Sequence, residues 1–109
     1  MKFTPFTTPL VAFMALVPTT FAASCGRSGF DPISWVVVAG GVPDISGICG
    51  GLWDSLNRFS ECWVSHPYCG PDVNGALKWE FTVPAICNAG MVESTWWEAT
   101  ANNWGSIDC

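Results

Sequence analysis

Six cysteines constrain this chain more than any other feature of its sequence. They are Cys25, Cys49, Cys62, Cys69, Cys87 and Cys109. An even number of cysteines in a small secreted chain is typical of a domain that is cross-linked by disulfides. The core of so short a chain is too small to be stable without such bridges. The sequence therefore predicts one domain that contains three disulfides.

The N-terminus has the pattern of a secretory signal peptide. Lys2 precedes an apolar run, residues 10–17, and the small residue Ala22 precedes a cleavage point. The apolar run is too short to span a bilayer, and no later run is long enough to do so. We therefore expect residues 1–22 to be removed and residues 23–109 to form a single secreted, extracellular domain without a membrane span.

The mature domain is acidic. Without Lys2, three basic residues (Arg27, Arg58 and Lys78) oppose nine acidic ones, which gives a formal net charge of −6. Nucleic acid and anionic membrane surfaces are poor partners for such a domain. His66 is the only histidine, and no two cysteines have the C-x-x-C spacing of zinc sites. We therefore expect no metal and no other cofactor.

Two segments have the three- and four-residue apolar spacing of amphipathic helices. In the segment 48–62, Leu52 and Leu56 lie on the apolar face and charged residues lie opposite. The second segment, 89–104, follows Asn88, a good N-cap residue, and ends before a glycine that suits a helix C-cap. The sequence therefore predicts two helices.

Four further segments are expected to form strands. Residues 33–40 are a β-branched run, typical of a central strand. Residues 63–66 form a short second strand that Pro67 ends, and residues 68–75 form a loop. Residues 77–83 alternate between apolar and polar side chains. Residues 106–109 are too few to form a strand alone, so a neighbouring strand and a disulfide at Cys109 must hold them.

The order of these elements is β-α-β-β-α-β. This order predicts an α+β two-layer sandwich of the ferredoxin-like kind, with a four-stranded antiparallel sheet and two helices on one face. The expected spatial order of the strands is four, one, three, two. Residues 25–32 enter this arrangement only as a lead-in.

The predicted topology brings the cysteines together at the two ends of the sheet. Its geometry favours three pairs: Cys49 with Cys69, Cys62 with Cys87, and Cys25 with Cys109. The last two pairs lie at the same end of the sheet and could be exchanged without much strain.

Three stretches carry a resemblance to a known group of proteins. They are the first helix, CGGLWDSLNRFSEC, the strand LKWEFTVP and the C-terminal CNAGMVESTWWEATANNWGSIDC. Together they resemble the small cysteine-rich secreted proteins of plant-associated fungi, and more narrowly the candidate effectors with the fold of the smut-fungus virally encoded killer toxin. The chain lacks the dibasic processing sites of that toxin, so toxin maturation is not expected. The resemblance implies a virulence-related role in the apoplast or against a competing microbe, and it supplies no catalytic residue.

The residues themselves do not indicate an enzyme. A hydrolase needs a nucleophile with a base, or two converging carboxylates. His66 precedes Pro67 at a strand end and is expected to be structural. Asp72 and Asp108 fit turn and hydrogen-bonding roles. The primary hypothesis is a secreted effector or antimicrobial-toxin-like protein that recognises a host or microbial partner through its surface.

The second helix carries a stripe that is separate from its apolar face. At 100° per residue, Glu93, Trp97 and Trp104 project between about 200° and 240°. Seven tryptophans are many for so short a chain, and their flat faces stack on sugar rings. If Trp97 and Trp104 are exposed, a carbohydrate-binding module is the alternative function, with a glycan as partner.

The first strand carries a second candidate surface. Alternation sends Val36 and Val38 to the face of the sheet away from the helices, beside polar residues of the strand 77–83. Phe30 and the segment after Cys25 are expected to cover these valines. Alternatively, the valines meet a partner or a second copy of a chain that is otherwise a monomer or a weak homodimer.

Overall fold

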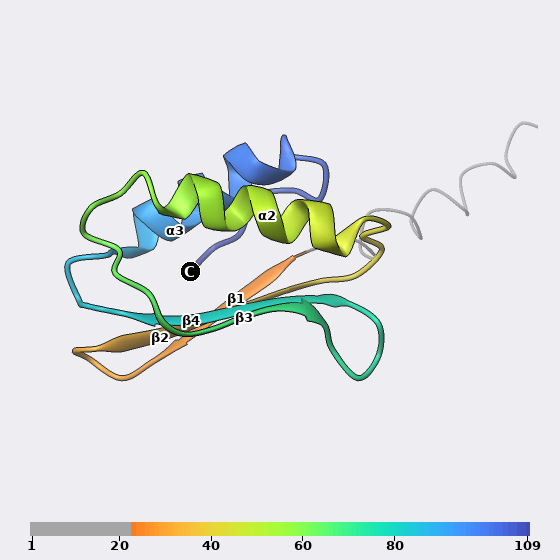
Figure 1. Cartoon of the computed structure of the whole chain (residues 1–109). Coiled ribbons are helices and arrows are strands. Elements are labelled where there is room, and N and C mark those ends of the chain that lie inside the picture. The colour runs from red at the N-terminus through yellow and green to blue at the C-terminus, as the bar shows by residue number, and fades with distance from the viewer. Residues whose placement is uncertain (1–22) are drawn as a thin grey trace, which may run out of the picture.

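The computed structural model describes residues 23–109 (Figure 1). Its elements are β1 (Ser24–Ser28), β2 (Ile33–Ala39), α2 (Ile45–Leu56), β3 (Ser65–Pro71), β4 (Leu77–Val83) and α3 (Ala89–Thr100). The predicted signal peptide, residues 1–22, lies outside the described residues. Within the described part, no helix has the length and apolar character that crossing a membrane requires.

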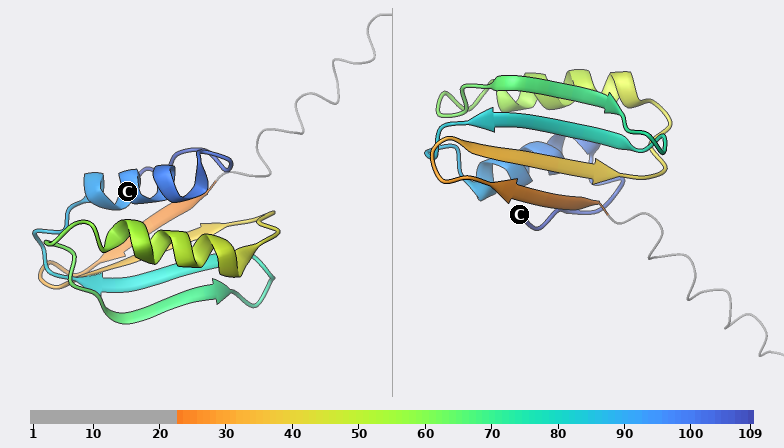
Figure 2. Two further views of the ribbon diagram at one scale, coloured as in Figure 1. Left: turned by 45° about the horizontal axis from the view of Figure 1, so that its top comes forward. Right: turned by 90° about the horizontal axis from the view of Figure 1, so that it is seen from below.

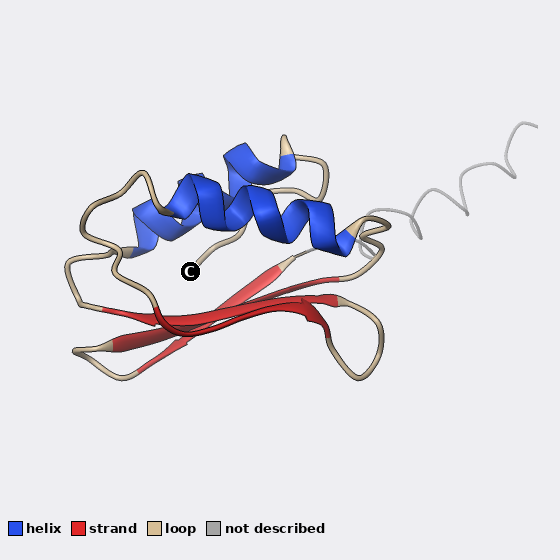
Figure 3. Ribbon diagram, viewed as in Figure 1, coloured by secondary structure: helices blue, strands red, loops and turns tan. Residues whose placement is uncertain are grey.

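The four strands form one antiparallel sheet in the order β1-β2-β4-β3, and both helices lie on one face of it (Figures 1 and 3). The predicted α+β two-layer sandwich is therefore confirmed. The predicted neighbours in the centre of the sheet are also correct, because the strand 33–39 pairs with the strand 77–83. The other face of the sheet, called the outer face below, has no helix on it (Figure 2, right).

The predicted element order was wrong at both ends of the chain. Residues 106–109 form no strand, and the sheet position beside β2 is occupied by β1, from the segment treated as a lead-in. β1 and β2 are joined by a tight turn that contains Gly29 at a φ of 83°. A strand that follows directly in the sequence costs less loop-closure entropy than one at the far terminus. The C-terminal segment instead runs beside the edge of β1, bridged through Cys109 (Figure 2, right).

The second predicted strand was placed too early. β3 begins at Ser65 and continues to Pro71, through residues that the sequence indicated as a loop. Pro67 is tolerated because β3 is an edge strand with a register irregularity between Ser65 and Tyr68, where His66 has a φ of 52°. Tyr68 and Cys69 therefore belong to the sheet.

Both helices are shorter than predicted. α2 begins after Asp44, whose side chain accepts a hydrogen bond from the backbone N–H of Gly47 at 3.1 Å. α3 begins after the predicted cap, Asn88, whose side chain accepts from the N–H of Met91 at 3.0 Å. α3 ends at Thr100, and its C-cap, Ala101, takes the left-handed conformation four residues before the expected glycine.

The core lies between the helices and the inner face of the sheet. Its largest fully buried side chains are Trp35, Trp79, Trp96, Phe81, Leu52 and Leu56. The Trp79 ring is central: its centroid lies 4.7 Å from that of Phe81 and 6.4 Å from that of Trp96. Aromatic contacts of this kind join β4 to α3.

Three disulfides connect the elements, and they are the three pairs that the geometry favoured. Cys49–Cys69 joins α2 to β3, Cys62–Cys87 joins two loops, and Cys25–Cys109 joins β1 to the C-terminus. No cysteine among the described residues is free. Each bridge thus ties two segments that are distant in the sequence.

Removal of a disulfide should destabilise the domain according to the length of chain that the bridge closes. Cys25–Cys109 spans 84 residues and Cys49–Cys69 spans 20. In the loop-entropy model these bridges contribute about 4.6 and about 3.3 kcal/mol. We expect Cys25→Ala/Cys109→Ala to lower the free energy of unfolding more than Cys49→Ala/Cys69→Ala, measured by urea denaturation in a stabilising osmolyte. The reverse order would show that contacts around each bridge outweigh chain entropy.

Candidate functional site

Two valines lie on the outer face of the sheet, in the middle of a central strand. Val36 is opposite Glu80, and Val38 is opposite Lys78. Both valines are partly exposed, whereas their neighbours on β2 are buried beneath the helices. The alternation of β2 therefore turns an apolar pair towards solvent, beside two charged residues of β4.

These valines form the floor of a depression of about 790 Å³, called the outer-face depression below. It is lined by Val36, Val38, Tyr68, Pro71, Asp72, Val73, Lys78 and Glu80. The β3–β4 loop bends to the side away from the helices (Figure 1), and Val73 in this loop is 99% exposed. The depression is thus open, with an apolar floor and an apolar residue at its end.

The β3–β4 loop has a fixed shape. The Oδ1 atom of Asp72 accepts hydrogen bonds from the backbone N–H groups of Asn74 at 2.8 Å and Ala76 at 3.0 Å. Gly75 completes the turn with a φ of 85°. The turn role that the sequence indicated for Asp72 is therefore present, and it holds Val73 in position.

Tyr68 lies along one side of the depression. Its hydroxyl donates a hydrogen bond to the carbonyl of Pro71 at 2.7 Å. Its ring lies over Gly70, where a Cβ atom would be 3.1 Å from the hydroxyl oxygen. Because glycine has no Cβ atom, the Tyr68 ring can lie in the space above residue 70. The sequence analysis missed Tyr68 because it placed this segment in a loop.

Both signs of charge lie beside the apolar floor. Lys78 Nζ is 3.5 Å from Glu80 Oε1, and both side chains are more than one-third exposed. An exposed pair of this kind contributes little to stability. It does give the depression a donor and an acceptor that can contact a partner.

The expected cover of the valines is absent, so this prediction was wrong. Phe30 is exposed in the turn between β1 and β2, and it does not line the depression. The segment after Cys25 lies in the plane of the sheet as β1 and pairs with β2. Backbone pairing thus uses the segment that was expected to cover the valines.

The predicted stripe on the second helix does not form a shared surface. Glu93 Oε2 accepts a hydrogen bond from the N–H of Cys109 at 2.9 Å. The indole N–H of Trp104 donates to the carbonyl of Gly41 at 3.3 Å, and its ring packs against the core. Only Trp97 remains open, with 51% of its surface exposed. Glu93 and Trp104 therefore anchor the C-terminal segment.

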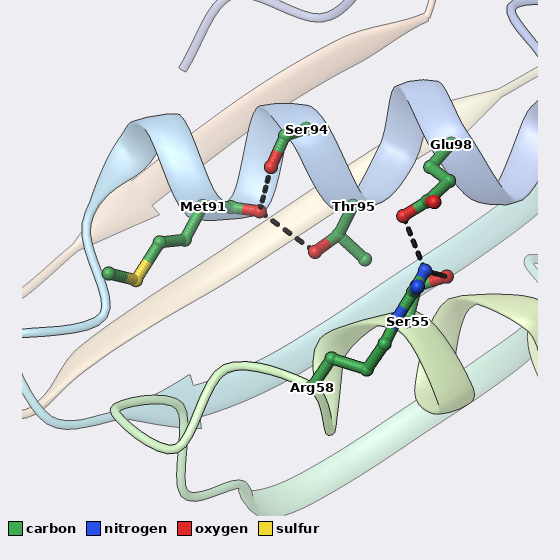
Figure 4. Close-up of polar contacts among 6 residues, drawn as sticks. All are labelled: Ser55, Arg58, Met91, Ser94, Thr95 and Glu98. Atoms are coloured by element: carbon green, nitrogen blue, oxygen red, sulfur yellow. Dashed lines mark hydrogen bonds and ion pairs between the residues drawn. The ribbon is translucent and has the colours of Figure 1, made fainter.

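The other polar contacts of the helix layer are structural (Figure 4). Arg58, after α2, forms an ion pair with Glu98 of α3 and so joins the two helices. The hydroxyls of Ser94 and Thr95 donate to the carbonyl of Met91, one turn back along the helix. Residues 23–109 contain no group of three or more histidine, cysteine, aspartate or glutamate side chains that could hold a metal ion.

A third surface escaped the sequence analysis. Large apolar side chains are exposed at the end of the sheet opposite the β3–β4 loop: Phe30, Trp63 and Ile86. Two of them are direct neighbours of bridged cysteines, Cys62 and Cys87. That adjacency is visible in the sequence, and the Cys62–Cys87 bridge brings the two backbone positions close together, but only the structure shows that both side chains are exposed.

No family model, curated protein or solved structure matches the chain. The similarity to effectors with the killer-toxin fold therefore stays a prediction from the sequence. Function must be inferred from the surfaces themselves.

Two glutamates on α3 provide a test of the C-terminal anchor. Glu93 holds the N–H of the last residue, whereas Glu98 forms only an exposed ion pair. We expect Glu93→Ala to lower the free energy of unfolding by about 1–2 kcal/mol, because a charged acceptor is lost from a partly buried hydrogen bond. Glu98→Ala, the matched control, should cost less than about 0.5 kcal/mol. Equal losses in urea denaturation would contradict the anchoring role.

Proposed function

We propose that this protein is a secreted interaction protein, an effector or antimicrobial-toxin-like molecule that acts where a fungus meets its host or a competitor. The outer-face depression is the surface that recognises the partner. The observation that carries this proposal is the uncovered pair Val36 and Val38 on a central strand, within a depression of about 790 Å³. Apolar side chains that are partly exposed within a groove rimmed by polar residues are candidates for a contact site.

Binding fits the chemistry of this depression better than catalysis. Asp72 is engaged by two backbone N–H groups, and Lys78 and Glu80 lie within ion-pair distance of each other. A nucleophile with an adjacent base is what a hydrolase would require there. The proposed role is therefore surface recognition without turnover of a substrate.

The framework suits action outside the cell. Multiple disulfides are typical of extracellular proteins. Three bridges in a small domain keep it folded outside the cell, where proteases would degrade an unfolded chain. We infer secretion into the apoplast, with a host or microbial protein as the partner. The formal charge of −6 disfavours nucleic acid.

Replacement of both outward valines tests this role. Val36→Thr/Val38→Thr keeps the β-propensity of the strand and removes apolar contact. We expect a melting temperature close to that of the wild type and at least a tenfold loss of affinity for the partner, equivalent to about 1.4 kcal/mol. Proteins from apoplastic fluid are captured on the immobilised wild type and on the immobilised variant, and the captured amounts are compared by quantitative mass spectrometry. The partner is the protein that the variant captures in a smaller amount.

The matched control is Phe30→Ser/Ile86→Ser, which removes exposed apolar surface at a different end of the sheet. This control should retain the partner. A sharp fall in the melting temperature of the valine variant would show that the valines are covered core. Unchanged recovery of every captured protein would show that the depression is not the recognition surface.

Carbohydrate binding is a second candidate, and one observation favours it. The Tyr68 ring is held at the side of the depression by its hydrogen bond to Pro71 and by the space over Gly70. An aromatic ring in a fixed position packs well against the apolar face of a sugar ring, with Lys78 and Glu80 as hydrogen-bonding groups nearby. This arrangement moves the proposed glycan site from Trp97 and Trp104 to Tyr68.

Two aromatic substitutions separate the glycan sites. We expect Tyr68→Ala to abolish binding in a panel of soluble oligosaccharides, and Trp97→Ala to leave it unchanged, measured by isothermal titration calorimetry. The opposite result would return the site to α3. If neither the wild type nor the variants bind any oligosaccharide, carbohydrate recognition is excluded for that panel and the protein partner remains.

A further inference from the structure

Phe30, Trp63 and Ile86 are three large apolar side chains that are exposed, and they are called the apolar cap below. Their exposed fractions are 89%, 76% and 64%. They come from the β1–β2 turn, the α2–β3 loop and the β4–α3 loop. These three loops lie together at one end of the molecule, away from the β3–β4 loop (Figures 1 and 2).

The loops of the apolar cap are tied to one another. The disulfide Cys62–Cys87, with Cα atoms 4.8 Å apart, joins the residue before Trp63 to the residue after Ile86. The Asp31 side chain, next to Phe30, accepts a hydrogen bond from the backbone N–H of Ala85 at 3.2 Å. Each of the three exposed side chains is therefore next in sequence to a residue that cross-links two loops.

A depression of about 370 Å³ lies beside Trp63, and most of its lining is apolar. It is lined by Trp63 and Val64, by Pro32, Val83 and Pro84 from the adjoining strand ends, and by the polar residues Asp31 and Ser65. Prolines and a disulfide leave these loops few alternative conformations. A contact made by side chains that are already held in place loses little conformational entropy.

We propose that the apolar cap docks the protein on a lipid surface, namely the interfacial layer of a zwitterionic bilayer. This inference concerns a surface separate from the outer-face depression and goes beyond the proposed function. Tryptophan and phenylalanine favour the boundary between headgroups and acyl chains, because their apolar bodies leave water there. Phe30 and Trp63, together with the apolar Ile86, enter that layer while the strands behind them stay in water.

The size of the apolar cap favours a bilayer over a protein as its partner. Phe30 and Trp63 each carry about 150–250 Å² of surface and Ile86 somewhat less, so at exposed fractions of 89%, 76% and 64% the three side chains expose on the order of 500 Å². A stable protein–protein interface buries about 800 Å² on each partner, with matched shape. A fluid bilayer adapts to a small protruding surface and needs no complementary pocket.

The charges around the apolar cap select the type of bilayer. The titratable groups in and beside its loops are Arg27, Asp31, Arg58, Glu61 and His66. Arg58 is paired with Glu98. Arg27 lies over the ring of Trp35, and the three loops contain no lysine. The apolar cap therefore offers no basic cluster that could bind anionic lipid, and the acidic domain is repelled from an anionic bilayer. Phosphatidylcholine, which has no net charge, is the lipid that this surface fits.

Vesicle flotation with the disulfide-bonded secreted protein tests the proposal. We expect the wild type to float with phosphatidylcholine vesicles and the bound fraction to fall at least about fivefold in Phe30→Ser/Ile86→Ser. Val36→Thr/Val38→Thr, the control on the outer face, should float as the wild type does. Melting temperatures of all variants establish that they are folded. If the double variant is not folded, the single variants Phe30→Ser and Ile86→Ser replace it in the flotation experiment.

Brominated phosphatidylcholine adds a positional measurement, because bromine quenches tryptophan fluorescence at short range. The wild type should be quenched, and Trp63→Phe should lose most of that quenching while it still floats. A wild type that does not float, or a double variant that floats equally well, would overturn the proposal. So would binding that requires phosphatidylserine. Loss of a captured protein by the double variant, without vesicle binding by the wild type, would assign the apolar cap to a protein partner instead.

Discussion

The pairing of β2 with β4 is the constraint on which the rest of the structure depends. In this register Trp35 and Val37 are fully buried beneath the helices. Val36 and Val38, between them, face the other way. A slip of one residue would exchange the two sets and place tryptophan in water. The core and the outer-face depression are therefore two results of one register, and neither can be altered without the other.

The disulfides explain how a small domain can leave large apolar side chains exposed. Bridges constrain the unfolded chain, so fewer apolar residues are needed in the core. Trp63 and Ile86 lie directly beside the Cys62–Cys87 bridge and remain exposed. The bridge, rather than burial of these two side chains, ties their loops together. Covalent cross-links thus allow apolar residues in these loops to stay exposed.

The sequence predicted those features that depend on strong local patterns. The alternation of residues 77–83, the cap at Asn88 and the outward direction of Val36 are set by residues close in the sequence. β1 could not be predicted in this way, because Ser24–Ser28 contains glycine and serine and little β-propensity. β1 becomes a strand because the turn after Ser28 returns the chain and because β2 pairs with it. Tyr68 was missed because Pro67 indicates a strand end, and that proline is acceptable because β3 is an edge strand with a register irregularity at this point.

The two proposed surfaces differ in direction as well as in chemistry. The apolar cap lies at the end of the sheet where β2 begins, and the outer-face depression lies along the same strand, beside its later residues. Seven residues of an extended strand span about 23 Å. If the protein docks on a bilayer through the apolar cap, its strands extend away from the bilayer. The outer face of the sheet then stays accessible to a partner. Lipid contact and partner recognition therefore need not compete, since no side chain of the apolar cap lines the depression.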